Sequence, residues 1–319
     1  MSDIGMKQML REEYGIGALS LRQVPSGWSA SAWMVQADSG DYFLKVYDKH
    51  KPSTKGWVAR IDSYMPVVLW LHANTGLRGS MSAPLLTKGG CYKWEDEAYL
   101  YMVFPFIHGQ TIGGGRLTSE QARSIARIAA ELHSHGAATP VPTDGLLETY
   151  DISFCDTLNQ WMQNLQGPDR WVEALTPHKD ATARATAALQ KAAAGLRRSQ
   201  PPLVLCHTDI HGWNLMQADR LMLIDWEGLR LAPVEADLFS FTETFFFDYA
   251  WEEFLSVYRS VHRGFEINTD AMRFYRLRRR LEDVHAFSES ILLDDLTSQD
   301  MERSLYYLNR ECALLHGML

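Results

Sequence analysis

The segment from His207 to Asn214 places side chains that handle protons and bind cations at fixed intervals. It reads HTDIHGWN and fits the pattern H-x-D-x-x-x-x-N. Asp209 supplies a carboxylate that can take a proton from a hydroxyl group. Asn214, five residues later, supplies an amide oxygen for a metal ion. The spacing therefore predicts phosphoryl transfer with Asp209 as the catalytic base.

A second carboxylate follows within a short distance along the chain. Eleven residues after Asn214, the apolar segment LMLI ends at Asp225. A strand that delivers an Asp at its end suits a second ligand of magnesium, which prefers hard oxygen atoms. Each motif alone is also explained by a turn or a helix cap. Their order, each beside a short apolar strand, favours a phosphotransferase site.

Lys45 is the predicted contact to the nucleotide phosphates. It lies in the strand-like segment YFLKVY, on the opposite face from Leu44 and Val46. A strand lysine of this kind grips the α- and β-phosphates and is held by a carboxylate of the next helix. Asp62, seventeen residues later, is the predicted partner, although it is one methylene shorter than the usual Glu. A solvated surface lysine is the competing interpretation.

The segment between the first two predicted strands is a candidate phosphate-binding loop. It contains a single glycine, so the hydroxyl groups of Ser26, Ser29 and Ser31 are the predicted contacts. An ordinary hairpin turn explains the same residues. The glycine run 113–115 is not followed by Lys-Ser or Lys-Thr, and it therefore does not predict a P-loop.

The distribution of predicted elements indicates an α+β protein with two lobes. Strand-like segments fill residues 18–47 and end again at Pro105, whereas helical periodicity dominates from Thr118 onwards. Thr118 and Gln121 form a predicted capping box. We expect a nucleotide-binding lobe over residues 1–104 and a catalytic and acceptor-binding lobe over residues 105–319.

The amino-acid composition disfavours some classes of binding partner. The formal charge of −8 over 319 residues disfavours a nucleic-acid partner and suits a cationic small molecule. The sequence has neither an apolar run long enough to span a membrane nor a signal-peptide pattern, so we expect a cytoplasmic protein without a membrane partner. Four widely spaced cysteines indicate reduced thiols.

With these motifs in place, the sequence resembles the aminoglycoside phosphotransferase and choline kinase family over most of its length. The resemblance rests on these stretches: GWSASAWMV, FLKVY, YMVFPFIHG, IARIAAELHS, VLCHTDIHGWNLM and LIDWEGLRLAPVEADL. It implies a bilobal fold like that of protein kinases, Mg²⁺ as the metal ion, and ATP or GTP as the phosphate donor.

The resemblance also implies roles for individual residues. The carbonyl group of Pro105 and the amide of Ile107 would contact the adenine edge at the hinge. His207 and Asp237 would support the catalytic loop. The Trp-Glu pair after Asp225 departs from the Phe-Gly of protein kinases.

The acceptor is expected to be a small molecule. Only a dozen residues separate Asp225 from Asp237, which leaves no activation segment to bind a protein substrate. Asp248, Trp251 and Glu252 are candidate acceptor contacts, and core packing or a solvated helix face explains them equally. An aminocyclitol or aminoglycoside-like acceptor is favoured by the resemblance. Choline, methylthioribose, thiamine or an amino sugar, or a non-catalytic nucleotide-binding role, remain alternatives.

Overall fold

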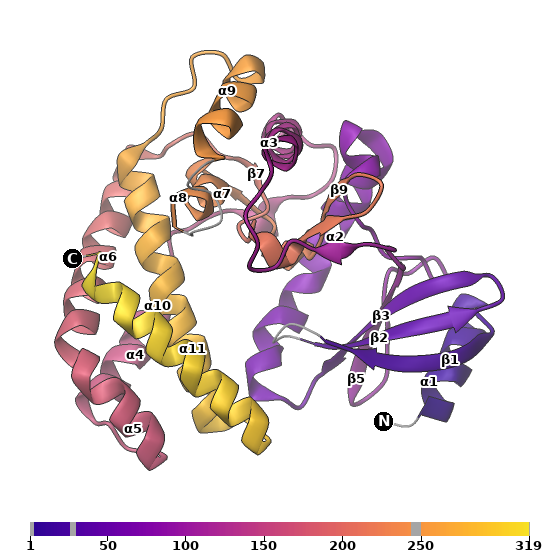
Figure 1. Ribbon diagram of the computed structural model, residues 1–319, viewed down its shortest axis with the longest axis horizontal. Coiled ribbons are helices and arrows are strands. Elements are labelled where there is room, and N and C mark those ends of the chain that lie inside the picture. The colour runs from indigo at the N-terminus through magenta and orange to yellow at the C-terminus, as the bar shows by residue number, and fades with distance from the viewer. Residues whose placement is uncertain (1–2, 26–29, 244–249, 319) are drawn as a thin grey trace.

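The computed structural model describes residues 3–25, 30–243 and 250–318, and it has two lobes (Figure 1). The smaller lobe is built on a five-stranded antiparallel sheet in the order β1-β2-β3-β5-β4. Its strands are β1 (Ala18–Val24), β2 (Ser31–Ala37), β3 (Gly40–Asp48), β4 (Trp94–Glu95) and β5 (Tyr99–Pro105). The short helix α1 (Asp3–Met9) and the long helix α2 (Lys55–Asn74) complete this lobe.

The larger lobe is mostly helical, as the sequence predicts. Two small sheets lie within it, one with strands β10 and β7 and one with the order β6-β8-β9. These strands are β6 (Gln110–Thr111), β7 (Val204–Cys206), β8 (Leu215–Gln217), β9 (Leu221–Leu223) and β10 (Arg230–Ala232). The helices are α3 (Ser119–His133), α4 (Phe154–Gln163), α5 (Asp169–Leu175), α6 (Lys179–Ser199), α7 (Glu235–Leu238), α8 (Ser240–Glu243), α9 (Trp251–Val261), α10 (Thr269–Leu293) and α11 (Ser298–His316).

Local sequence signals explain several element boundaries. The predicted capping box at Thr118 is confirmed, because its hydroxyl accepts from the backbone N–H of Gln121 while the Gln121 side chain accepts from the N–H of Thr118. Pro66 lies inside α2 instead of at its start. The strand β5 ends at Pro105, and we propose this point as the boundary between the lobes.

Lys45 lies in the middle of the sheet and not at an edge. In β3 it faces Ala32 of β2 on one side and Met102 of β5 on the other. Leu44 and Val46 point to the opposite face and are buried in a cluster beneath the sheet. This alternation aims the Lys45 side chain at the larger lobe, because successive residues of a strand face opposite ways.

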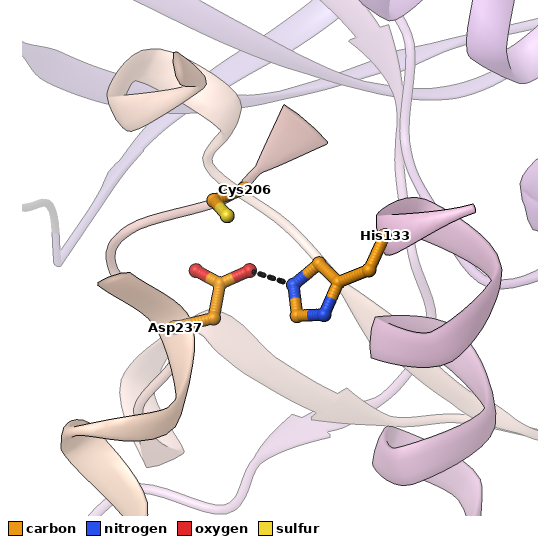
Figure 2. A group of neighbouring side chains, drawn as sticks. All are labelled: His133, Cys206 and Asp237. Carbon is orange, nitrogen blue, oxygen red and sulfur yellow. Dashed lines mark hydrogen bonds and ion pairs between the residues drawn. The ribbon is translucent and has the colours of Figure 1, made fainter. Parts of the chain in front are cut away.

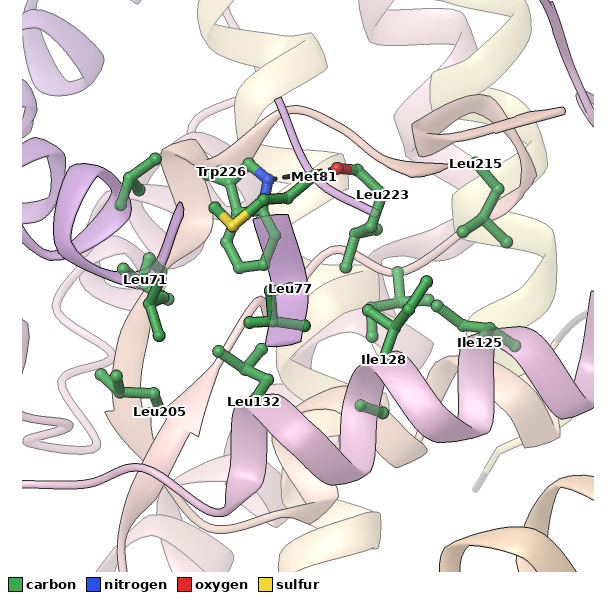
Figure 3. Packing of buried hydrophobic residues seen from close by; sticks show 14 of the residues in the cluster. Leu71, Leu77, Met81, Ile125, Ile128, Leu132, Leu205, Leu215, Leu223 and Trp226 are labelled. Atoms are coloured by element: carbon green, nitrogen blue, oxygen red, sulfur yellow. Dashed lines mark hydrogen bonds between the residues drawn. The ribbon is translucent and has the colours of Figure 1, made fainter. Parts of the chain in front are cut away.

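A shared hydrophobic core joins the elements that carry the active site. Figure 3 shows Leu71 of α2, Ile128 of α3 and Leu205 of β7 around Trp226, the residue that follows Asp225. The Trp226 side chain is buried. The loop after β9, which carries Asp225 and Trp226, is therefore positioned by the same core that holds α2 against the larger lobe. A separate cluster fills the space among α4, α6, α10 and α11.

Within the described residues, none of the helices combines the length and the apolar character that crossing a membrane requires.

Candidate active site

The predicted catalytic loop, residues 207–214, follows β7 and is closed by hydrogen bonds between Asp209 and Asn214. The Asn214 side-chain Nδ2 donates to the backbone oxygen of Asp209 at 2.9 Å and to Asp209 Oδ2 at 2.9 Å. His211 Nε2 lies 3.4 Å from the same carboxylate oxygen. Because Nδ2 is committed to Asp209, the Oδ1 atom of Asn214 is the one left to bind a cation.

The side chain of Asp237 binds the backbone at the start of this loop. Its carboxylate accepts hydrogen bonds from the backbone N–H groups of His207, at 2.9 Å, and Thr208. Thr208 has a φ of 66°, a conformation that costs energy for a β-branched residue. Its hydroxyl group donates to the carbonyl oxygen of Gly228 at 2.8 Å. The Asp237 carboxylate and this bond together stabilise the strained turn that presents Asp209.

Asp237 also belongs to a buried group with His133 and Cys206 (Figure 2). His133 Nε2 lies 2.9 Å from Asp237 Oδ2, and His133 Nδ1 lies 2.9 Å from the hydroxyl oxygen of Tyr258. Burial raises the pKa of the Cys206 thiol well above its usual value, whereas a metal ion needs the thiolate. We therefore interpret the group as a structural support that ties α3 to the catalytic loop.

Backbone contacts place Asp225 beside the catalytic loop. The N–H group of Ile224 donates to the carbonyl oxygen of Asn214 at 2.9 Å. The His207 Nε2 atom is 3.1 Å from the carbonyl oxygen of Ile224, and its ring packs edge-on against Trp226. Burial lowers the pKa of His207, so the ring is neutral and Nε2 donates the bond. Asp225 itself adopts a φ of 66°.

Lys45 reaches across from the sheet to this loop. Its Nζ atom lies 2.8 Å from Asp225 Oδ1 and also donates to Glu227 Oε1. The same Glu227 oxygen accepts a bond from the Tyr47 hydroxyl. Burial favours the neutral amine, but the adjacent negative charges of Asp225 and Glu227 raise the pKa of Lys45. Lys45 is therefore charged, as a phosphate contact requires.

The predicted pairing of Lys45 with Asp62 is wrong. Asp62 Oδ1 accepts from the Tyr92 hydroxyl at 2.8 Å, and Asp62 pairs with Lys93 on the surface. Its side chain is 63% exposed, compared with 10% for Glu227. Lys45 instead pairs with Glu227, two residues after Asp225, because the Glu227 side chain reaches Lys45 Nζ whereas the Asp62 side chain faces solvent. The Trp-Glu departure after Asp225 was the sequence signal for this residue.

The Oδ1 side of Asp209 is covered by α10. The guanidinium group of Arg279 donates from Nη1 to Asp209 Oδ1 and from Nε to Asp283 Oδ2, the latter at 2.9 Å. Partial burial favours the neutral carboxyl of Asp209, but the charge of Arg279 holds its pKa well below the usual value. Burial raises the pKa of Asp283 to about 6. Sequence reasoning missed both α10 residues.

Other predicted nucleotide contacts are placed by the strands. Ser31 opens β2 opposite Val46, and Pro105 closes β5 opposite Tyr42. Ile107 lies two residues beyond the end of β5. Ser26 and Ser29 lie outside the described residues. The adenine and phosphate contacts of these residues therefore remain predictions.

The predicted acceptor contacts on α9 are not brought to Asp209. Trp251 stacks against Phe254 at a ring distance of 5.9 Å and packs on Phe241, so it contributes to the hydrophobic core. Glu252 is exposed. Figure 1 shows α9 at the end of the larger lobe away from the five-stranded sheet. The helix that contacts Asp209 is α10. Asp248 lies outside the described residues.

Asn214 and Asp225 form a donor set that fits magnesium. One offers an amide oxygen and the other a carboxylate, both hard oxygen ligands. The Asp225 side chain is 33% exposed, which leaves room for the water molecules that magnesium retains. The charge of Lys45 beside them is placed to meet nucleotide phosphates.

The sequence matches the phosphotransferase enzyme family over residues 20–275. The chain belongs to this family. Members use ATP to phosphorylate hydroxyl groups of small molecules, and the protein is a phosphotransferase of this kind. Among proteins of curated function, none matches the sequence.

Solved structures of this phosphotransferase family share the fold across the entire chain. Spectinomycin phosphotransferase APH(9)-Ia in complex with ADP and spectinomycin is 17% identical, with a TM-score of 0.80 over 100% of this chain and 98% of that chain. A microcompartment-associated aminopropanol kinase is 17% identical, with a TM-score of 0.66 over 99% and 97%. Choline kinase LicA from Streptococcus pneumoniae is 16% identical, with a TM-score of 0.59 over 98% and 99%. The predicted bilobal fold is thereby confirmed.

Proposed function

We propose that this phosphotransferase transfers the γ-phosphate of ATP, in the presence of Mg²⁺, to a hydroxyl group of an amine-bearing small molecule. The observation that carries the proposal is the contact of Lys45 Nζ with Asp225 Oδ1 at 2.8 Å. It joins the phosphate-binding strand of one lobe to the metal loop of the other, with Asp209 one hydrogen-bonded loop away. These are the parts that phosphoryl transfer needs.

Each residue then has a defined task. Lys45 binds the α- and β-phosphates, and Asn214 and Asp225 hold Mg²⁺. The ion, when bound, neutralises charge that develops on the β- and γ-phosphates. Asp209 orients the acceptor hydroxyl and accepts its proton while the oxygen attacks the γ-phosphorus and ADP departs. Glu227 and Tyr47 hold Lys45, and Asp237 holds the loop that carries Asp209.

For the acceptor, we propose an aminocyclitol or aminoglycoside-like compound such as spectinomycin. The proposal is supported by the TM-score of 0.80 to a phosphotransferase that binds spectinomycin. Amino alcohols such as choline or aminopropanol are the second candidate, because enzymes for both share this fold. Turnover of spectinomycin would indicate a role in antibiotic resistance. Because ATP and Mg²⁺ are cytoplasmic, we propose that the protein acts there.

The test is ADP release by the purified full-length protein with Mg²⁺ and ATP, and GDP release with GTP. Acceptors are offered one at a time: spectinomycin, aminoglycosides, choline, aminopropanol, methylthioribose, thiamine and amino sugars. Phosphorylated product is identified by mass spectrometry. We expect one acceptor class to raise ADP release well above the water background, and Asp209→Asn to abolish the increase. Equal ADP release by the Asp209→Asn variant would refute the proposed site.

A further inference from the structure

The side chain of Arg279 contacts Asp209, the proposed catalytic base. Its Nη1 atom donates to Asp209 Oδ1, and its Nε atom is 2.9 Å from Asp283 Oδ2. The side chains of Arg279, Asp209 and Asp283 are 35%, 32% and 22% exposed. The guanidinium group thus lies between two carboxylates at a position that solvent and small molecules can reach.

The two oxygen atoms of Asp209 are not equally available. Oδ2 accepts from Asn214 Nδ2 at 2.9 Å, and this bond belongs to the closed catalytic loop. Oδ1 is the atom that Arg279 contacts. Oδ2 already faces two side chains, Asn214 Nδ2 and His211 Nε2, the latter at 3.4 Å, whereas Oδ1 faces Arg279. An acceptor hydroxyl that approaches Oδ1 therefore meets the guanidinium group of Arg279 and competes with it for the space beside that oxygen.

The pair with Asp283 allows Arg279 to leave without losing every partner. Arg279 and Asp283 are four residues apart on α10, the spacing at which side chains of a helix are neighbours. Release from Asp209 breaks the bond at Nη1 at the far end of the side chain, and the bond at Nε remains. Because the guanidinium group is planar and rigid, it leaves Asp209 by a change of the side-chain torsions before Nε, and the neighbouring Asp283 carboxylate remains within reach as its acceptor.

We propose that Arg279 is a displaceable counter-ion of Asp209, which gives way to an acceptor that brings an ammonium group of its own to the Asp209–Asp283 pair. The exchange keeps the charge between the two carboxylates constant, so a cationic acceptor enters without leaving either carboxylate unpaired. A neutral alcohol lacks this compensation. The inference rests on the proposed function and extends it to the acceptor class, an amino alcohol with its ammonium group near the reactive hydroxyl.

The exchange has a consequence for water. With Arg279 on Oδ1, its guanidinium group fills the approach of a water molecule to that oxygen, and its positive charge makes Asp209 a weaker base. When Arg279 is absent, a water oxygen can bond to the γ-phosphorus as the bond to the β–γ bridging oxygen breaks. The water proton passes to Asp209, and the products are ADP and inorganic phosphate. Arg279 therefore suppresses hydrolysis of ATP between turnovers.

The test measures ADP release from ATP and Mg²⁺ without any acceptor. We expect Arg279→Gln to raise this background roughly 10-fold, and the added change Asp209→Asn to return it to the wild-type level. Arg273→Gln removes an exposed arginine from the same helix and serves as the matched control, with no increase expected. Arg279→Lys keeps the charge but lacks the planar guanidinium fork that reaches Asp209 and Asp283 through separate nitrogen atoms, so we expect a smaller increase. This variant carries the test if Arg279→Gln proves unfolded by its thermal melt.

Chemical rescue probes the cation position directly. We expect millimolar propylammonium chloride to suppress the raised background of Arg279→Gln, and sodium chloride at equal ionic strength not to do so. An unchanged or lower background in both Arg279 variants would overturn the inference and make Arg279 a permanent positioning residue. Failure of the proposed function gives a different result, in which wild-type protein and Asp209→Asn release ADP equally with every acceptor.

Discussion

The nucleotide side and the acceptor side of the active site are fixed by different means. On the proposed nucleotide side, Ile224 sets the position of Asp225: its N–H donates to the carbonyl oxygen of Asn214, and its own carbonyl oxygen is contacted by the His207 ring. On the proposed acceptor side, Asp209 contacts the side chain of Arg279 on α10, 70 residues further along the chain. Backbone contacts tolerate almost any substitution around them, whereas a contact through Arg279 depends on that side chain alone.

This difference shows how one phosphotransferase frame can serve many acceptors. The geometry that handles ATP is set by short loops between buried strands, and it can stay constant while the helices of the larger lobe change. We propose that the acceptor side is formed by side chains of α10, which can change independently of these loops. Substitutions on the two sides should therefore differ in kind, and their effects are expected to fall in the following order.

The largest effect is expected where the two sides meet. Asp209→Asn removes the proton acceptor while keeping a polar side chain of the same shape. Turnover should fall roughly 10²–10⁴-fold, the range for a positioned base, and ATP affinity should stay within a few-fold of wild type. Steady-state kinetics and titration calorimetry measure the two quantities. A variant with near-normal turnover would show that Asp209 is misassigned.

On the nucleotide side, Lys45→Met should lower both stability and turnover. It leaves Glu227, whose side chain is only 10% exposed, without its cation. We expect a loss of about 1–3 kcal/mol in the free energy of unfolding and roughly 10²-fold in turnover. Urea denaturation and ADP release measure these losses. Lys49→Met, at a more exposed pair just beyond the end of β3, is the control. Equal losses in both variants would contradict a special role for Lys45.

On the acceptor side, Asp283 should make stability depend on pH. Burial raises its pKa in the folded protein from 3.8 to about 6, so between these values the folded state binds more protons than the unfolded state. The contribution of Asp283 to stability is complete below pH ~4 and is lost as the pH rises through about 6.

Asp283→Asn removes this titration. Relative to the variant, the wild type should lose about 1–2 kcal/mol of unfolding free energy between pH 4.5 and 6.5. Urea denaturation across this interval gives the comparison, with the exposed Asp295→Asn as the control. Parallel pH profiles for wild type and Asp283→Asn would show that Asp283 does not titrate there.

The smallest effect is expected for Asp62→Ala. The residue lies on α2 but pairs with Lys93 at the surface, and exposed ion pairs contribute about 0–1 kcal/mol. Turnover should stay within a factor of about 2 of wild type. The measurement compares the rate of ADP release by Asp62→Ala with that by Glu227→Ala. A strong loss for Asp62→Ala, with little for Glu227→Ala, would restore the pairing that the sequence predicts.

The sequence predicts the two-lobed fold because apolar alternation and the Thr118 capping box are local signals. It also predicts that Asp209, Asn214 and Asp225 cluster, since short strands flank one loop. It predicts Asp62 as the partner of Lys45, but the partners in the structure are Asp225 and Glu227. The rotation of α2, which turns Asp62 outward, is not visible in the local sequence.

The acceptor residues show the opposite limit. Acidic and aromatic residues near Trp251 resemble a binding wall in sequence, but ring packing against Phe254 takes Trp251 into the core. Arg279 lies in an arginine-rich stretch that reads as an ordinary charged helix face. Its contact with Asp209 depends on how α10 packs within the larger lobe, and this packing cannot be predicted from the local sequence.

The buried carboxylate of Asp237 has a consequence for how the molecule folds. Its partners His133 and His207 lie 104 and 30 positions earlier in the chain, so the contacts close large loops. Loop closure of this size costs entropy before any contact compensates it, which delays such contacts during folding. We therefore expect the turn that presents Asp209 to form late in folding, once α7 has brought Asp237 to it. A partly folded chain could then have its helices and still lack a working base.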